Sequence, residues 1–243
     1  MLKKLLFWLS GAFFVSGAIA YYFWQEATHI PQWYQASRTE EVNPSSVTEP
    51  ALPPAIEAKI ATQIQQKSQG NPPSNQAIAV NLSYPEVNQW LTTEINQQLR
   101  TQTAKVLPSA PTIQTQLKDN RLEIGTVINS QQLASAKFSR SQQAIVDRLM
   151  TNFPQLQNQT FYLGVEGKPQ VKEGQLVLDK NSQVRVGNLT FSVTEVAQKI
   201  GVSPQTLQRA LTIDLGNVNL QDWQFQDQNV LLKVAPQSLP ASP

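Results

Sequence analysis

Carboxylates are the only side chains present in numbers that could carry out acid–base catalysis. The chain has 243 residues, no cysteine and one histidine, His29. Without cysteine it forms no disulfide, thiol nucleophile or thiolate metal site, and one histidine cannot build a multi-histidine metal centre. His29 precedes the region that we expect to fold, so no Ser-His-Asp triad can form there.

The carboxylates themselves lie mostly at expected turns, helix caps and polar helix faces, where solvation explains them. A pair able to hydrolyse a glycosidic bond needs a proximity that spacing along the chain does not reveal. We therefore predict no catalytic residue, no metal site, no cofactor and no enzyme activity. The formal net charge of +2 is too small to indicate a nucleic-acid partner by itself.

Residues 196–211 carry the sharpest local motif, a helix-turn-helix pattern that resembles the recognition segment of AraC-type regulators. Ala197, Gly201 and Leu207 stand at the spacing of a bacterial two-helix DNA reader. However, Arg209 is the only basic residue of the second helix, where several DNA contacts are usual. We therefore favour two short capped helices packed on a sheet, and keep DNA binding as an outlier.

An apolar run at the N-terminus predicts a membrane span. Residues 5–24 contain no charge, and an α-helix of that length covers about 30 Å, the thickness of a bilayer core. Lys3 and Lys4 precede the run, so the positive-inside rule predicts a cytoplasmic N-terminus and an extracytoplasmic remainder. The alternative is a signal peptide cleaved after Ala20. Both interpretations export the rest of the chain.

Composition divides the chain into four parts. Seven prolines fall within 25–75 among Ser, Glu and Gln, a mixture that buries too little apolar surface to fold alone. We expect Ile30, Trp33 and Tyr34 in this stretch to rest on the membrane interface. The expected parts are a transmembrane anchor at 1–24 and a Pro/Gln-rich stalk at 25–75, with a short helix near 55–67. An α+β extracytoplasmic domain at 76–235 and a disordered tail at 236–243 follow.

Apolar periodicity and turn residues predict the elements of the domain. Asp119-Asn120 marks a hairpin turn, and Ser83, Ser192 and Ser203 stand at expected helix starts. The expected strands are 77–82, 112–117, 121–128, 161–165, 175–178, 184–191, 218–225 and 230–234, and the expected helices are 84–102, 143–153, 193–200 and 204–211. Strands grouped in hairpins favour an α+β fold with an antiparallel sheet.

The order of these elements and their apolar spacing resemble a known family over about residues 76–234. The residues that carry the resemblance are Asn88, Trp90, Leu91 and Ile95 on the first helix, then Gly174–Leu178, Val186–Phe191 and the helix from Val193. With an N-terminal anchor and a closing hairpin, this pattern resembles the YpmS-like family of membrane-anchored extracytoplasmic proteins of unknown function. More distantly, it is similar to the tubular lipid-binding proteins.

The resemblance implies a curved antiparallel sheet around a long amphipathic helix, and binding of a lipid or another hydrophobic ligand near the membrane. It transfers no site residue to this chain. The apolar face of the first helix is the candidate wall of an apolar groove, and its residues are Val87, Trp90, Leu91, Ile95 and Leu99. The alternative is a structural or assembly protein that docks an envelope partner through a helix at 56–64 or a sheet edge. The expected partners are therefore the bilayer, an apolar ligand or an envelope protein, and no nucleic acid.

Overall fold

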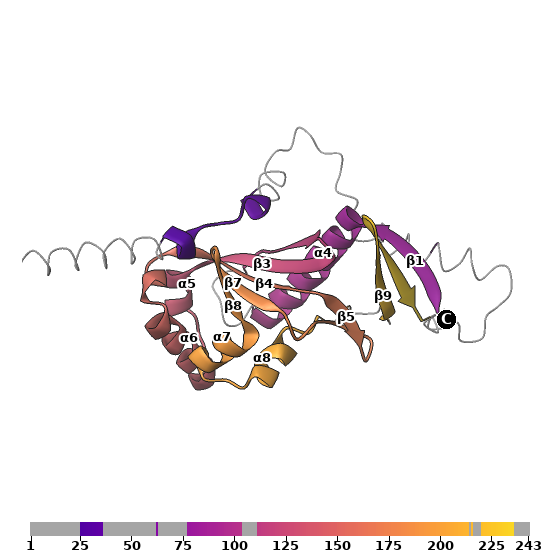
Figure 1. The fold of residues 1–243 in the computed structure, drawn as a ribbon. Coiled ribbons are helices and arrows are strands. Elements are labelled where there is room, and N and C mark those ends of the chain that lie inside the picture. Colours follow the sequence, from indigo (N-terminus) through magenta and orange to yellow (C-terminus); the bar gives the residue numbers. More distant parts are fainter. Residues whose placement is uncertain are drawn as a thin grey trace, which may run out of the picture.

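The fold is α+β, with curved antiparallel sheets and several helices (Figure 1). The structure is a computed structural model, and it describes residues 25–35, 62, 77–103, 111–213, 215 and 220–235. The predicted anchor, most of the stalk with its short helix, and the predicted tail lie outside the described residues. Within the described part of the chain, no helix has the length and apolar character needed to cross a bilayer.

A three-stranded sheet joins the two ends of the domain. Its order is β1-β10-β9, and both pairings are antiparallel. The strands are β1 (Ile78–Ser83), β9 (Leu220–Gln226) and β10 (Asn229–Val234). Alternate side chains of β1 and β10, among them Val80, Leu82 and Leu232, are fully buried. The predicted first strand and the predicted closing hairpin are both confirmed.

The long helix α4 (Tyr84–Thr103) follows β1 directly, as its start signal predicts. The backbone N–H and the hydroxyl of Ser83 both donate to the Glu86 carboxylate, at 2.8 and 2.9 Å. This contact fixes the chain where strand becomes helix. The helix then packs between the two larger sheets, and its apolar face enters the main hydrophobic core.

The second sheet has five strands in the order β2-β3-β4-β7-β8, all antiparallel. The strands are β2 (Ile113–Lys118), β3 (Arg121–Asn129), β4 (Thr160–Gly167), β7 (Gln183–Val186) and β8 (Leu189–Ser192). Asp119 and Asn120 both have positive φ, 51° and 58°, as the hairpin turn expected there requires.

The region predicted as one strand, 184–191, is two strands. Gly187, with a φ of 59°, lies in the turn between β7 and β8. The strand-forming residues Val184, Val186, Leu189 and Phe191 on both sides of Gly187 concealed this turn. A small hairpin of β5 (Pro169–Lys172) and β6 (Gln175–Leu178) completes the strands, and β5 was not expected.

The open edge of β2 is occupied by side chains of α4. Asn96 pairs with Ile113 as a neighbouring strand would, because its amide accepts the backbone N–H and donates to the carbonyl, both at 2.8 Å. Thr92 and Asn88, one and two turns earlier, accept further N–H groups of β2 at 3.2 and 2.8 Å. A polar stripe on the helix therefore closes this edge to other strands.

Short helices cover the other end of the five-stranded sheet. They are α5 (Ser130–Ala134), α6 (Arg140–Asn152), the 3-10 turn η1 (Pro154–Leu156), α7 (Val193–Ile200) and α8 (Pro204–Ala210). The expected capping box of Ser192 and Glu195 starts α7, and Gly201 ends it with a φ of 70°. Val196 and Ile200 are buried in a cluster with Val184, so the helix-turn-helix segment packs against the sheet.

Candidate functional site

The apolar face of α4 is divided between core and cavity. Val87, Trp90 and Leu91 are buried to 2 % exposure or less. They pack with residues of both sheets in the main cluster, so they do not line an open groove as expected. Ile95 and Leu99 are only half-buried. The three-stranded sheet covers the first half of the helix face, and this long-range packing was not visible in the helical spacing.

Ile95 lines an apolar cavity of about 150 Å³ beside the second half of α4. Most of the wall is aliphatic, and the lining residues are Ile95, Gln98, Ile124, Val165, Leu178 and Ala210–Ile213. The last of these segments is fixed because Ile213 exchanges two backbone hydrogen bonds with Leu176, at 2.8 and 3.1 Å. The "apolar cavity" of the sections below is this space between α4, the sheet and the chain after α8.

A second region lies on the opposite, outer face of the five-stranded sheet. Residues 25–35, the "N-terminal strap", cross this face (Figure 1). Ala27 and Tyr34 are buried, at 0 % and 4 % exposure. The Glu26 carbonyl accepts the backbone N–H of Asn188 at 2.8 Å, and the Tyr34 hydroxyl donates to the Thr112 carbonyl at 2.9 Å.

The strap changes the expectation for the start of the stalk. Tyr34 and Trp33 were expected at the membrane interface, but both rings contact Tyr162 of β4, with centroids 5.7 and 6.1 Å apart. Composition concealed this packing because the partner surface comes from strands far along the chain. The first residues after the predicted span are thus part of the folded domain.

Tyr162 forms the floor on which the strap rests. Its ring covers two glycines on neighbouring strands, Gly125 and Gly164, and a Cβ at either position would collide with the ring. Its hydroxyl donates to the Glu123 carboxylate at 2.9 Å. Two glycines inside strands were the only signal in the sequence for a close approach of this kind.

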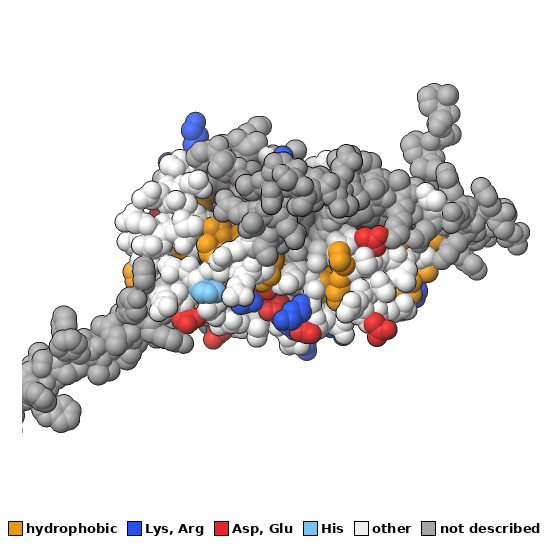
Figure 2. Space-filling model, turned by 90° about the horizontal axis from the view of Figure 1, so that it is seen from above, with side chains coloured by type: hydrophobic (Ala, Val, Ile, Leu, Met, Phe, Trp, Pro, Cys, Tyr) orange, Lys and Arg blue, Asp and Glu red, His pale blue; other side chains and the backbone are white. Residues whose placement is uncertain are grey.

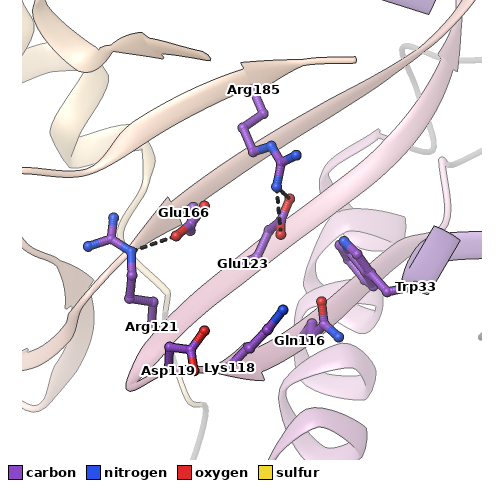
Figure 3. Close-up of a pocket in the computed structure, with 8 residues that line it drawn as sticks. All are labelled: Trp33, Gln116, Lys118, Asp119, Arg121, Glu123, Glu166 and Arg185. Atoms are coloured by element: carbon purple, nitrogen blue, oxygen red, sulfur yellow. Dashed lines mark hydrogen bonds and ion pairs between the residues drawn. The ribbon is translucent and has the colours of Figure 1, made fainter. Parts of the chain in front are cut away.

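A polar pocket of about 250 Å³ opens beside the strap, lined by Trp33, Gln116, Lys118, Asp119, Arg121, Glu123, Glu166 and Arg185 (Figure 3). Figure 3 shows two ion pairs in it, one between the neighbouring strands β3 and β4 and one that reaches across β4 from β7 to β3. Arg185 contacts Glu123 at 3.1 Å, and Arg121 contacts Glu166 at 2.5 Å. Viewed from above, charged side chains of both signs gather on this face (Figure 2).

Glu123 is the most deeply buried charged group of this pocket, at 8 % exposure. Burial raises the pKa of its carboxyl above the ordinary value, while Arg185 and the Tyr162 hydroxyl oppose the shift. Burial and the nearby Glu123 raise the pKa of Tyr162 as well. Glu123 therefore accepts hydrogen bonds from Tyr162 and Arg185 inside the sheet, whereas the buried Nε of Arg185 has no hydrogen-bond partner among the described residues.

Nothing in the described part of the chain suggests a metal centre, because no three His, Cys, Asp or Glu residues gather there. No protein-family model matches the chain, and neither a curated protein nor a solved structure matches it at a significant level. The resemblance to the YpmS-like family therefore stays a prediction.

Proposed function

We propose that this protein is a membrane-anchored extracytoplasmic domain that binds a lipid or another hydrophobic ligand without catalysis. The observation that carries the proposal is the apolar cavity. The cavity lies beside α4, whose apolar face is the candidate wall of a ligand groove. Ile95 belongs both to that face and to the lining of the cavity.

The chemistry of the cavity wall favours an apolar guest. Ile124 and Val165 on the inner face of the sheet and Leu178 opposite them offer no hydrogen-bonding side chain. Gln98 and Thr212 are the two polar residues of the lining. A guest with an apolar body and a polar end, such as a fatty acyl group, matches this distribution.

The size of the cavity limits the guest. A dry apolar cavity of about 150 Å³ accepts a molecule of the size of benzene. The space beside Ile95, of about the same volume, therefore takes one segment of an acyl chain rather than a complete lipid. The remainder of the ligand would extend past the chain that follows α8.

The alternative function is assembly with an envelope protein, which would dock on a sheet edge or on a helix at 56–64. The edge of β2 is occupied by Asn88, Thr92 and Asn96 of α4. That edge is therefore not offered to a partner strand, and the 56–64 segment lies outside the described residues apart from Thr62. The other outer strands of the two larger sheets, β1, β8 and β9, stay candidate docking edges for this alternative, and we rank ligand binding first because of the apolar cavity.

Filling the cavity tests the proposal. Ile95→Phe places a larger side chain in the space, and Ile145→Phe makes the same change in a separate cluster on α6. With the detergent-extracted full chain and a fluorescent long-chain fatty acid, we expect Ile95→Phe to weaken binding roughly tenfold or more. The control should bind as the unsubstituted protein does.

Two results would contradict ligand binding. One is equal affinity of the fatty acid for both variants, which would place the guest elsewhere. The other is an unsubstituted protein that binds no fatty acid and releases no co-purifying lipid in mass spectrometry of the extracted protein. In that case assembly with an envelope protein becomes the leading function.

A further inference from the structure

We propose that α5, α6 and the loop between them form a surface that rests on a bilayer containing anionic lipid. This "helical end", residues 130–152, is a contact with the membrane surface and is separate from the apolar cavity. The inference depends on the predicted span at residues 5–24 and not on the ligand that the cavity binds.

The strap places the predicted membrane exit next to the helical end. Ala27 is fully buried in a cluster with Phe153 and Leu156, which directly follow α6. Figure 1 shows the first strap residues beside α5, at the end of the molecule away from β5 and β9. Since Gln25 follows the last residue of the predicted span, the bilayer surface lies within a few residues of this end.

Docking of the strap also removes the freedom that a flexible tether would give. The Glu26 carbonyl is held by the Asn188 N–H, and Gly187 allows the strap backbone to approach so closely that a Cβ would collide with the carbonyls of Glu26 and Ala27. A domain attached in this way cannot present every side to the membrane. The side nearest the attachment is the one that faces it.

The composition of α6 suits a membrane surface. None of its residues is fully buried, although it carries four branched aliphatic or thioether side chains. Ile145, Leu149 and Met150 pack partly against the domain, whereas Val146 belongs to none of the core clusters of the described residues and is half-exposed. Amphipathic helices with exposed apolar and basic residues are typical of the lipid headgroup region.

The charges of this end point to the same partner. Residues 124–165 contain three cations, Lys137, Arg140 and Arg148, and one carboxylate, Asp147. All three cations are exposed, and Arg148 also donates to the carbonyls at the end of α7, whereas Lys137 and Arg140 face solvent. The strap contributes the Glu26 carboxylate nearby. Three cations against the carboxylates of Asp147 and Glu26 leave this end with a small positive excess, which anionic headgroups attract.

The absence of cysteine allows a direct test with the full chain. Ser141→Cys labels exposed α6, and Gln175→Cys labels exposed β6 near the other end of the molecule. Each variant carries one fluorophore and is reconstituted in vesicles of phosphatidylethanolamine and phosphatidylglycerol with a quencher attached to the lipid headgroup. We expect strong quenching at position 141 and little at position 175.

Paired charge reversals then test the electrostatic part. Lys137→Glu with Arg140→Glu should reduce quenching at position 141 at least several-fold. Added salt should also reduce quenching at position 141 when Lys137 and Arg140 are unchanged. Lys168→Glu with Lys172→Glu makes the same charge change on exposed residues at the β5–β6 hairpin and should leave quenching at position 141 unchanged.

Equal quenching at both positions would overturn the proposal, because it would show a domain that turns freely above the bilayer. Quenching only at position 175 would overturn it, because it would show that the opposite end of the domain faces the bilayer. Protection of position 141 by a second protein would show that a protein, and not the bilayer, covers this surface. A chain that does not enter the vesicles would remove the predicted span and the proposal together. Fatty-acid binding in detergent, measured on the same variants, separates these outcomes from failure of the cavity.

Discussion

The two faces of the five-stranded sheet are buried by different means. On the inner face, Leu122 and Ile124 of β3 point into a core that α4 completes. On the outer face, the intervening Glu123 is buried by Tyr162 and Arg185, with the strap packed beside them. The inner face uses apolar contact with a helix that is close in sequence, and the outer face uses polar contacts and a distant segment.

The difference shows that burial and polarity are independent in this sheet. Alternation along β3 places polar residues such as Glu123 on one face of the sheet, a pattern typical of a solvated face. Glu123 at 8 % exposure shows that this face is partly a packed interface. Substitutions on the two faces should therefore differ in magnitude and in their dependence on pH.

The largest effect is expected from the inner side. Trp90→Ala removes a side chain that is 2 % exposed in the main core, so the free energy of unfolding should fall by about 3–5 kcal/mol. Chemical denaturation of the full chain in detergent measures it. Trp33→Ala, which changes a half-exposed residue of the strap, should lower the free energy of unfolding clearly less than Trp90→Ala does. A Trp90→Ala variant as stable as the original would place Trp90 on an open groove, contrary to the structure.

The floor of the outer face should be the next most sensitive position. Gly125→Ala puts a Cβ into the ring of Tyr162, and forced displacement of a packed ring should cost about 1–3 kcal/mol. Denaturation curves supply the measurement. In a Tyr162→Ala background the same change at Gly125 should cost little, because the obstacle is gone. Additive losses would mean that the ring does not lie over Gly125.

Attachment of the strap should depend weakly on a single hydroxyl. Tyr34→Phe removes the bond to the Thr112 carbonyl, which still accepts the Thr126 hydroxyl at 2.9 Å. We therefore expect a loss of about 0.5–1.5 kcal/mol in the free energy of unfolding. Tyr84→Phe, which removes an exposed hydroxyl bound to Asn120, is the matched control and should cost less. A larger loss in the control would contradict the packing of the strap.

The smallest effect is a change in pH dependence. Because burial raises the pKa of Glu123 above its ordinary 4.5, the folded protein binds this proton more tightly than the unfolded chain. The contribution of Glu123 to stability therefore decreases as pH rises from about 4.5 through the raised pKa. Glu123→Gln removes this decrease.

Hydrogen bonds lower the pKa values of Glu195 and Asp222, so their contributions to the pH dependence of stability have the opposite sign. Both residues are present in the original protein and in Glu123→Gln, so comparing the two proteins isolates the contribution of Glu123. The stability of the original protein relative to Glu123→Gln should decline across this pH range. A difference that does not vary with pH would show that Glu123 is solvated.

Local signals in the sequence were sufficient for most individual elements. Alternation and capping residues predicted β1, α4, the β2–β3 hairpin and the closing strands within a few residues of their bounds. They failed at Gly187, where strand-forming residues stand on both sides of a turn, and at β5, which is short and begins at a proline. These failures are local conflicts between apolar pattern and turn chemistry.

The sites depended on contacts that local signals do not contain. The apolar face of α4 was visible in the spacing of its residues, but the division between core at Trp90 and cavity at Ile95 depends on where the three-stranded sheet lies. The polar stripe of Asn88, Thr92 and Asn96 was equally regular, yet its role in closing β2 requires that strand beside it.

The sequence alone determined the order of most elements, the α+β class and the apolar side of the elements that it predicted, because these follow from side-chain period and turn chemistry within a few residues. The tertiary structure decided which surfaces meet. It placed the strap on Tyr162, beside the pocket in which Tyr162 contacts Glu123. It also left the apolar cavity where α4, the sheet and the chain after α8 do not fill the space between them. The strap and Tyr162 are more than a hundred positions apart in the sequence. No periodicity along the chain records which distant segment will complete a surface.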